Sequence, residues 1–172
     1  PTGGVADLEF EARTTNGTVM CEDKVRFCAF RSLVVIFGGR DQVPSDPPNT
    51  NFSAFVIATN LYQHGFDVHI YDEENSANAN AEVDSAVARR NISGVAIIGY
   101  SWGGDAAFDT AAHLNGNTNS FAIKYTAYID AVNNPYNPVH ISQDQRPTNT
   151  LHHVNYYQRT GYSILNLRGD AI

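Results

Sequence analysis

The chain has 172 residues, an ordinary apolar content of 42% and a formal net charge of −7. This length favours a single domain, here residues 1–172, with enough chain to bury a sizeable core. The acidic balance and the few lysines argue against nucleic acid or anionic lipid as partners. No apolar run is long enough for an integral membrane segment. A small neutral or apolar substrate fits this charge better than a polyanion.

Residues 1–30 predict a peripheral N-terminal segment. Leu8–Ala12 alternates between apolar and polar residues, as an edge strand or a tail would, and Lys24–Phe30 alternates as a second short strand. Cys21 and Cys28 lie in this segment, either joined in a small disulfide loop or present as two thiols. Their spacing matches neither a metal site nor a CxxC motif. The first residue is Pro1 rather than Met, and no signal peptide is visible, which suits a processed protein or an expressed fragment. We expect an extracellular location.

From residue 32 onward, predicted strands and helices alternate. Continuous apolar or β-branched runs predict four buried strands, at Ser32–Phe37, Phe66–Tyr71, Gly94–Ser101 and Phe121–Ile129. Apolar residues at helical spacing predict the three helices between them, at Asn51–His64, Ala81–Arg90 and Asp105–Asn115. Polar or proline-rich composition predicts two loops, at Gln42–Thr50 and Asp72–Asn80.

This alternation predicts a three-layer α/β sandwich, with a mostly parallel central sheet and right-handed crossovers. Ala131–Thr150 is rich in Asn, Pro and Gln and predicts a long excursion over the carboxyl ends of the strands. Leu151–Arg159 predicts a last strand, and Gly161–Ile172 is ambiguous. In such sheets the chemistry gathers at the carboxyl ends of the strands.

The third predicted strand ends in Gly-x-Ser-x-Gly, from Gly99 to Gly103. A strand, a sharp turn and a helix with serine at the apex form a nucleophile elbow, in which the flanking residues must be small. Gly99 and Gly103 meet that requirement. The pattern predicts that Ser101 projects its hydroxyl clear of the sheet edge. The backbone N–H of Trp102 would then face the oxyanion of a tetrahedral intermediate.

A serine nucleophile needs a base within hydrogen-bond reach and a carboxylate that orients the base. Asp130 is the best acid, because it follows an apolar strand directly; Asp144 is a weaker substitute. An oxyanion hole needs a second donor, which we place in the loop after the first buried strand. Gly39 is the first choice for that N–H, and Arg40 the second.

The base is harder to assign. Three histidines follow Asp130, namely His140, His152 and His153. His152 and His153 enter the predicted last strand from the wrong end. Two hypotheses therefore stay open. Either one of the three, with His153 as the first candidate, reaches Ser101 by an unusual route, or the base lies beyond Ile172. We favour the second.

These residues resemble the α/β-hydrolase superfamily, particularly its lipase and serine-esterase branch. The likeness rests on Val34–Gly39, Gly99–Gly104 and Tyr128–Val132, and it spans residues 30–160. One departure is Phe37, which stands where the family usually has a histidine before the oxyanion glycine. A second is the length of the chain, which leaves no room for a cap domain.

The resemblance implies Ser101 as nucleophile, Asp130 as triad acid, and the N–H groups of Trp102 and Gly39 as oxyanion donors. It implies no cofactor and no metal. The first functional hypothesis is a serine hydrolase that cleaves a small-molecule or lipid-like acyl ester through an acyl-enzyme. Thioesters and amides stay open as acyl donors, because fold and elbow do not select the leaving group.

Two other hypotheses differ in class. The chain could be a catalytically incomplete α/β-hydrolase-like binding module that lacks the triad histidine. It could also be a flavodoxin-like nucleotide binder, although it has neither a GxGxxG motif nor a P-loop. The sequence does not indicate an oligomeric state.

Overall fold

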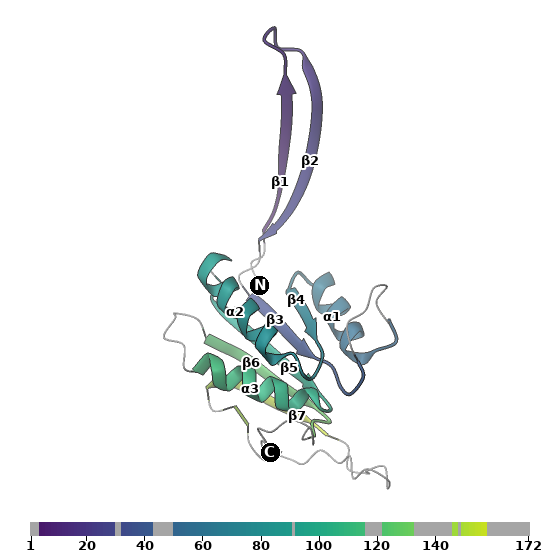
Figure 1. The fold of residues 1–172 in the computed structure, drawn as a ribbon, viewed down its shortest axis with the longest axis vertical. Helices are drawn as coiled ribbons and strands as arrows, with labels where there is room; N and C mark the ends of the chain where they lie inside the picture. The colour runs from purple at the N-terminus through teal and green to yellow at the C-terminus, as the bar shows by residue number, and fades with distance from the viewer. Residues whose placement is uncertain are drawn as a thin grey trace.

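The computed structural model describes residues 4–29, 32–42, 50–90, 92–115, 122–132, 146–147 and 149–157. The strands in these ranges form a two-stranded sheet and a five-stranded sheet. The two-stranded sheet extends away from the helices and the larger sheet, as Figure 1 shows. None of the helices in these ranges is both long enough and apolar enough to cross a membrane.

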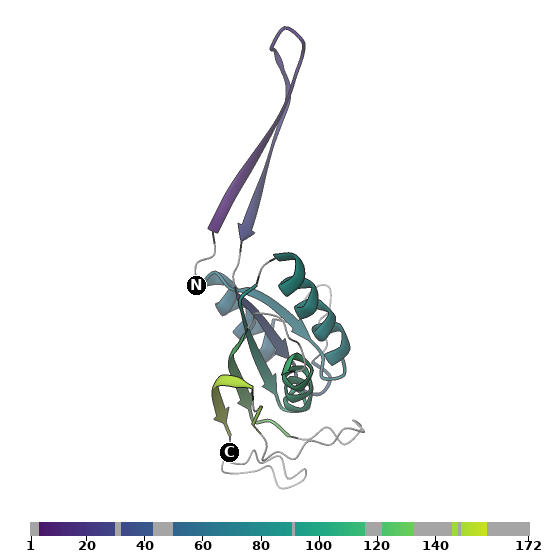
Figure 2. The ribbon, with the colours of Figure 1, turned by 90° about the vertical axis from the view of Figure 1, so that its left-hand side faces the viewer.

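The two-stranded sheet is a hairpin of β1 (Gly4–Arg13) and β2 (Val19–Ala29). Its turn is closed by hydrogen bonds from Thr14 N to Thr18 O (2.8 Å) and from Gly17 N to Thr14 O (2.9 Å), and Gly17 has a φ of 85°. Both strands are longer than the alternating stretches predicted. The open end of the hairpin lies next to the larger sheet, and its turn points away from that sheet (Figure 2).

The five-stranded sheet contains β3 (Ser32–Phe37), β4 (Asp67–Tyr71), β5 (Gly94–Tyr100), β6 (Ala122–Ile129) and β7 (Thr150–Tyr156). Their order in space is β4-β3-β5-β6-β7, and every neighbouring pair is parallel. The β-branched run of β3 lies near the centre of this sheet, where both faces are covered.

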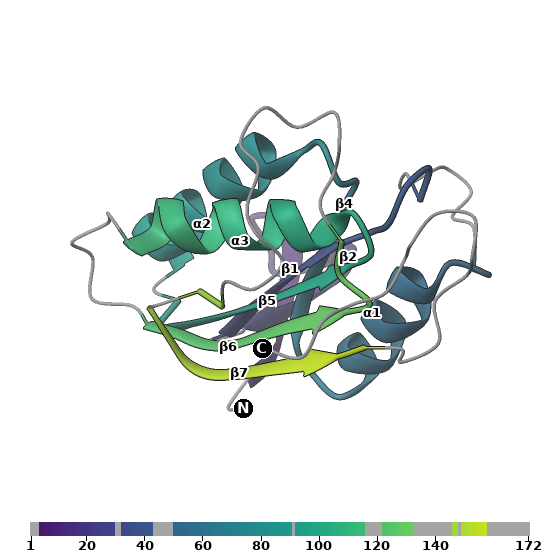
Figure 3. The same ribbon diagram turned by 90° about the horizontal axis from the view of Figure 1, so that it is seen from below.

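Helices cover both faces of this sheet. α1 (Ser53–Gln63) packs on one face, and α2 (Ser76–Arg90) and α3 (Gly103–Asn115) pack on the other (Figure 3). Successive strand residues point to opposite faces, so two cores form. Leu33, Val35 and Phe37 belong to the core under α2 and α3, whereas Val34 and Ile36 belong to the core under α1. The predicted three-layer α/β architecture is confirmed.

The largest difference from the predicted boundaries is at α2, which begins at Ser76 and not at Ala81. In the polar stretch 72–80, only the residues before Ser76 form a loop, and the rest belong to α2. The Asn75 side chain donates to the Asp72 carboxylate (2.7 Å), and the Asn75 carbonyl accepts the N–H of Ala79 (3.1 Å). Ala79 is fully buried. Polar side chains here form the turn that starts the helix, so polarity alone gave the wrong boundary.

The hairpin decides between the two alternatives for the cysteines. Cys21 and Cys28 lie on the same strand, opposite Ala12 and Val5. Seven residues of extended chain separate their Cα atoms by about 23 Å, whereas a disulfide needs them within about 7 Å. On one extended strand, the two Cα atoms therefore lie outside the range that a disulfide between them requires.

This separation of the Cα atoms predicts that no disulfide joins Cys21 to Cys28 within one chain. Monomeric protein unfolded in denaturant without reductant should react with two equivalents of a thiol reagent, as it does after reduction. A yield of zero thiols in the unreduced monomer would contradict the register of the hairpin.

Candidate active site at the strand–helix turn

The order of the sheet places its topological switch point between β3 and β5. From β3 the chain passes through α1 to β4 on one side, and from β4 it passes through α2 back to β5 on the other. Open α/β sheets bind ligands outside the carboxyl ends of the strands at such a switch point. The loop after β3 and the turn after β5 meet there, and these carry Gly39 and Ser101.

Ser101 occupies the sharp turn between β5 and α3. Its φ is 52°, in the left-handed region that residues other than glycine seldom adopt. The Ser101 carbonyl accepts the N–H of Gly104 (3.0 Å), and the Trp102 carbonyl accepts the N–H of Asp105 (3.3 Å). Strained backbone of this kind costs of order 1–3 kcal/mol and persists only where the surroundings enforce it.

Two glycines enforce this turn. A Cβ added to Gly99 would overlap the carbonyl of Gly103. A Cβ added to Gly103 would lie 2.5 Å from the carbonyl oxygens of both Phe37 and Gly38. The turn is therefore pressed against the end of β5 on one side and against the loop after β3 on the other.

Asp130 lies beside this turn. The N–H of Ser101 donates to Ile129 O (3.0 Å), and the carbonyl of Ser101 accepts the N–H of Val132 (3.0 Å). These two bonds bracket Asp130, which has a φ of 45° and donates its own N–H to Tyr156 O (2.6 Å). Ser101 and Asp130 are both partly exposed. The structure thus brings the predicted acid next to the predicted nucleophile.

Gly39 lies against the same turn from the other side. A Cβ on Gly39 would be 3.0 Å from Ser101 Cβ and 3.0 Å from Tyr100 Cδ1. The N–H of the preceding Gly38 donates to Tyr71 O (2.9 Å), so it is committed to the sheet. Gly39 is then the first residue of the loop whose N–H has no role in strand pairing.

Arg40 lies over Trp102, with its guanidinium carbon 4.9 Å from the centre of the ring. This cation–π contact joins the loop after β3 to the residue that follows Ser101. Four residues predicted for the site, Ser101, Asp130, Gly39 and Trp102, are therefore gathered at one edge of the sheet.

His153 is not gathered there. Ile97, Thr126 and His153 lie in register across β5, β6 and β7. Ser101 lies four residues beyond Ile97, so His153 is about 13 Å back along the strands and two strands to the side. Its Nδ1 pairs with Thr126 Oγ1 (2.7 Å), which holds the ring at that level. His153 is out of hydrogen-bond reach of Ser101.

The other described histidines also lie away from the carboxyl edge of the sheet. They are found along the strands or at the far ends of the helices, namely His64, His69, His113 and His152. His140 and Asp144 fall outside the described residues. No histidine in the described ranges is placed to act as the base of Ser101.

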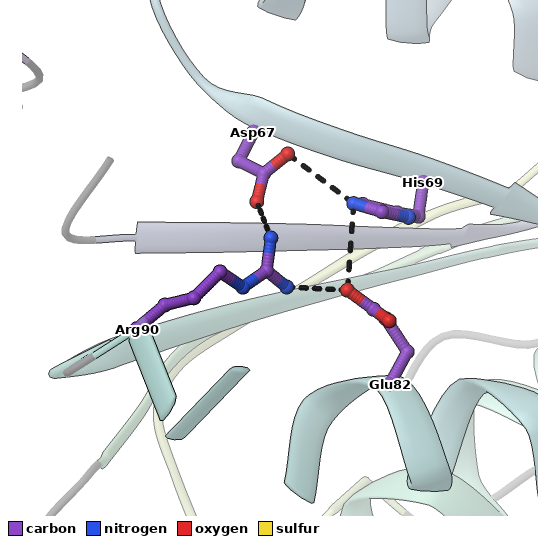
Figure 4. Close-up of polar contacts among 4 residues, drawn as sticks. All are labelled: Asp67, His69, Glu82 and Arg90. Atoms are coloured by element: carbon purple, nitrogen blue, oxygen red, sulfur yellow. Dashed lines mark hydrogen bonds and ion pairs between the residues drawn. The ribbon is translucent and has the colours of Figure 1, made fainter. Parts of the chain in front are cut away.

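The sequence did not single out a polar cluster at the opposite end of β4 (Figure 4). Arg90 Nη1 lies 2.8 Å from Asp67 Oδ2, and Arg90 also pairs with Glu82. His69 Nε2 lies 3.2 Å from Asp67 Oδ1 and 3.7 Å from Glu82 Oε1. These contacts tie the edge strand β4 to α2. Asp67 and His69, two apart on one strand, were the available signal, because residues at i and i+2 share a face.

No group of three or more acidic, histidine or cysteine side chains in the described ranges has the arrangement of a metal site.

A scan against models of protein families finds no match, and a search of curated protein sequences finds none either. Among solved structures, the chain is similar to a crystal structure described as a putative hydrolase from Agrobacterium vitis S4. The two share 11% identity with a TM-score of 0.42, over 77% of this chain and 54% of that one. The chain spans about half the length of that protein.

The contacts of Gly103 predict a steep penalty for a side chain at that position. Gly103→Ala should lower the free energy of unfolding by roughly 1–3 kcal/mol or more, because the new methyl group meets rigid backbone. Gly94→Ala is the matched control, since its Cβ would meet the flexible side chain of Lys124. Urea unfolding measures both variants. Equal stability of the two would contradict the close packing of the turn.

His153 predicts a specific pH dependence of stability. Burial lowers the pKa of the His153 imidazole, and Arg146 lowers it further. A lowered pKa means that the unfolded chain binds the proton more readily. The free energy of unfolding should therefore fall as the pH drops below the ordinary histidine value of about 6.5.

The variants His153→Gln and the exposed neighbour His152→Gln separate this effect from other titrations. Urea unfolding between about pH 7.5 and pH 5 should show a smaller acid-induced loss for His153→Gln than for His152→Gln. The same loss in both variants would refute the assignment to His153.

Proposed function

We propose that the chain carries the catalytic centre of a serine hydrolase that cleaves carboxylic esters through an acyl-enzyme on Ser101. The observation that supports this most is the positive φ of Ser101 at the switch point of the sheet, with Gly39 packed against the same turn. A strained serine at that position is what a nucleophile elbow requires. A simple strand-to-helix connection does not require it.

The proposed reaction has two halves. In the first, Ser101 Oγ attacks the acyl carbonyl, gives its proton to the base and forms a tetrahedral oxyanion. The base then protonates the departing alcohol, which leaves the acyl group on Ser101. In the second half, water attacks the acyl-enzyme with the same base accepting its proton. The carboxylic acid leaves and Ser101 is restored.

The oxyanion is assigned to two backbone donors. Trp102 N–H lies at the start of α3, where backbone N–H groups point out of the helix end and favour negative charge. Gly39 N–H is the second donor, because the N–H of Gly38 is already given to Tyr71 O. Losing one such donor typically slows a reaction by 10²–10³-fold.

Asp130 is assigned the role of orienting the base. Its backbone is bracketed by the two hydrogen bonds of Ser101, so its carboxylate starts from a fixed place beside the nucleophile. The base itself is a histidine outside the described residues. Within this sequence His140 is that histidine, and a histidine of a longer chain is the alternative source.

A binding module without turnover is the second candidate, and the remoteness of the described histidines favours it. The strand order β4-β3-β5-β6-β7 is also that of flavodoxin-like sheets, so strand order alone does not distinguish a nucleotide site. A phosphate site needs successive backbone N–H groups around an anion. Such a phosphate site does not require a strained serine or the two glycines that flank it.

A fluorophosphonate probe tests the proposal. The folded chain should gain the mass of one phosphonyl group, and peptide mapping should place it on Ser101. Ser101→Ala should abolish the labelling, while the exposed Ser93→Ala should leave it unchanged. Well-folded protein that takes up no label, or label that persists in Ser101→Ala, would rule out an activated Ser101.

His140→Ala extends the test to the base. If His140 is the base, labelling of this variant should slow by at least two orders of magnitude, since an unassisted serine is a poor nucleophile. Labelling at the normal rate would assign the base to a residue outside this sequence or to another side chain.

A further inference from the structure

The side chain of Arg40 has no role in the reaction proposed above. It is 58% exposed, yet its guanidinium carbon lies 4.9 Å from the centre of the Trp102 ring. Its Nε atom also lies 3.4 Å from Asp41 Oδ2, in an ion pair between exposed groups, which contributes little. That pair joins two sequence neighbours. The contact with the ring, by contrast, ties the loop after β3 to a different segment.

The two proposed oxyanion donors lie just outside the tightest contact of the site. That contact is the approach of Gly103 to the carbonyl groups of Phe37 and Gly38. Gly39 follows it on the loop, and Trp102 precedes it on the turn. The tight contact therefore fixes the base of the two segments, but the direction of each donor N–H depends on its own segment.

The Gly39 side of this pair is the less constrained. Gly39 follows another glycine, and glycines have access to more backbone conformations than other residues. The turn that begins at Gly39 is closed by the bond from Gln42 N to Gly39 O (2.9 Å), and Asp41 within it has a φ of 59°. Residues other than glycine seldom adopt such a φ. Local preference does not hold this turn in one shape, so a contact with another segment is needed.

Arg40 supplies such a contact. It directly follows Gly39 in the turn, and its guanidinium lies on the side chain of Trp102, whose N–H is the other donor. A planar guanidinium can stack on an aromatic face while its edges stay hydrated, which suits a partly exposed position. One side chain thus connects the residue next to one donor with the residue that carries the other.

We propose that Arg40 is a positioning residue of the oxyanion hole: its guanidinium, resting on the Trp102 ring, holds the turn Gly39–Gln42 so that the N–H groups of Gly39 and Trp102 converge on one oxyanion. The catalytic consequence rests on the proposed function. The contact of Arg40 with the ring does not.

Three substitutions of Arg40 separate its properties. Arg40→Lys keeps a cation that can lie over the ring, Arg40→Met keeps a long side chain without the charge, and Arg40→Ala removes both. Arg89→Ala is the matched control, because Arg89 is an exposed arginine in the last turn of α2 and its loss changes the net charge equally. Circular dichroism and urea unfolding establish which variants fold.

The first readout is quenching of fluorescence, because Trp102 is the only tryptophan in the chain. A guanidinium on the ring attracts iodide and repels caesium ions. No other lysine or arginine lies in the described residues that directly follow the strands of the larger sheet. The ratio of iodide to caesium quenching should therefore fall by about twofold or more in Arg40→Ala and Arg40→Met, but not in Arg40→Lys or Arg89→Ala.

This first measurement does not need an active enzyme. An equal ratio of iodide to caesium quenching in Arg40→Ala and Arg89→Ala would overturn the contact between the guanidinium and the ring.

The second readout is the kinetics of phosphonylation by a neutral fluorophosphonate. Arg40→Ala should slow the covalent step roughly tenfold, less than the loss of a whole donor, because the donor is displaced and not removed. Arg40→Lys should keep most of the rate, and the initial binding constant of the probe should change little. A residue needed only for stability would not show this split. A wild-type rate in Arg40→Met would overturn the role of the cation.

Trp102→Leu tests whether Arg40 acts through the ring, since this variant keeps the backbone N–H. In the Trp102→Leu background, adding Arg40→Ala should slow the covalent step by less than about twofold, because the partner of the guanidinium is already gone. A full further loss in that background would overturn the positioning through Trp102.

The outcomes separate the two proposals. Wild-type protein that takes up no label, with a lowered ratio of iodide to caesium quenching in Arg40→Ala, refutes the serine chemistry and keeps the contact of Arg40 with the ring. Wild-type labelling, with Arg40→Ala equal to Arg89→Ala in both readouts, overturns the role of Arg40.

Discussion

The site depends on the close contact between the turn after β5 and the loop after β3. A single methyl group at Gly103 would reach 2.5 Å from two carbonyl oxygens of that loop, so the two segments approach only because the side chain is missing. At this contact the backbone of Ser101 has a positive φ, and Gly39 lies beside it. Without it, a serine, a glycine and an aspartate would lie on three separate loops.

Backbone hydrogen bonds join the turn after β5 to the segment that follows β6 and to the end of β7. Ser101 is bonded to Ile129 and to Val132, on the two sides of Asp130, and Asp130 is bonded in turn to Tyr156 at the end of β7. The other polar contacts, around His69 and His153, lie further back along the sheet and join its strands to each other and to α2. The candidate site residues and the polar contacts that join the strands and α2 therefore lie in different parts of the sheet.

The sequence predicted the features that have a short local signal. Apolar runs such as Leu33–Phe37 predicted the strands, and these residues are buried. The glycine spacing around Ser101 predicted the sharp turn. The start of α2 was wrong, because Asn75 begins the helix through side-chain bonds that composition does not reveal. The position of His153 depends on the register of β7, which no local pattern encodes. Glu73 stands between two other acids in the sequence, and its burial depends on the fold.

In the proposed mechanism, Gly39 and Trp102 flank the place where an oxyanion forms on Ser101. The most direct measurement is a crystal structure of the chain phosphonylated by the fluorophosphonate. The phosphonyl oxygen should lie about 2.7–3.1 Å from the backbone nitrogens of both Gly39 and Trp102, as it does for donors in an oxyanion hole. A phosphonyl oxygen that points to solvent, or an adduct on a residue other than Ser101, would contradict the account.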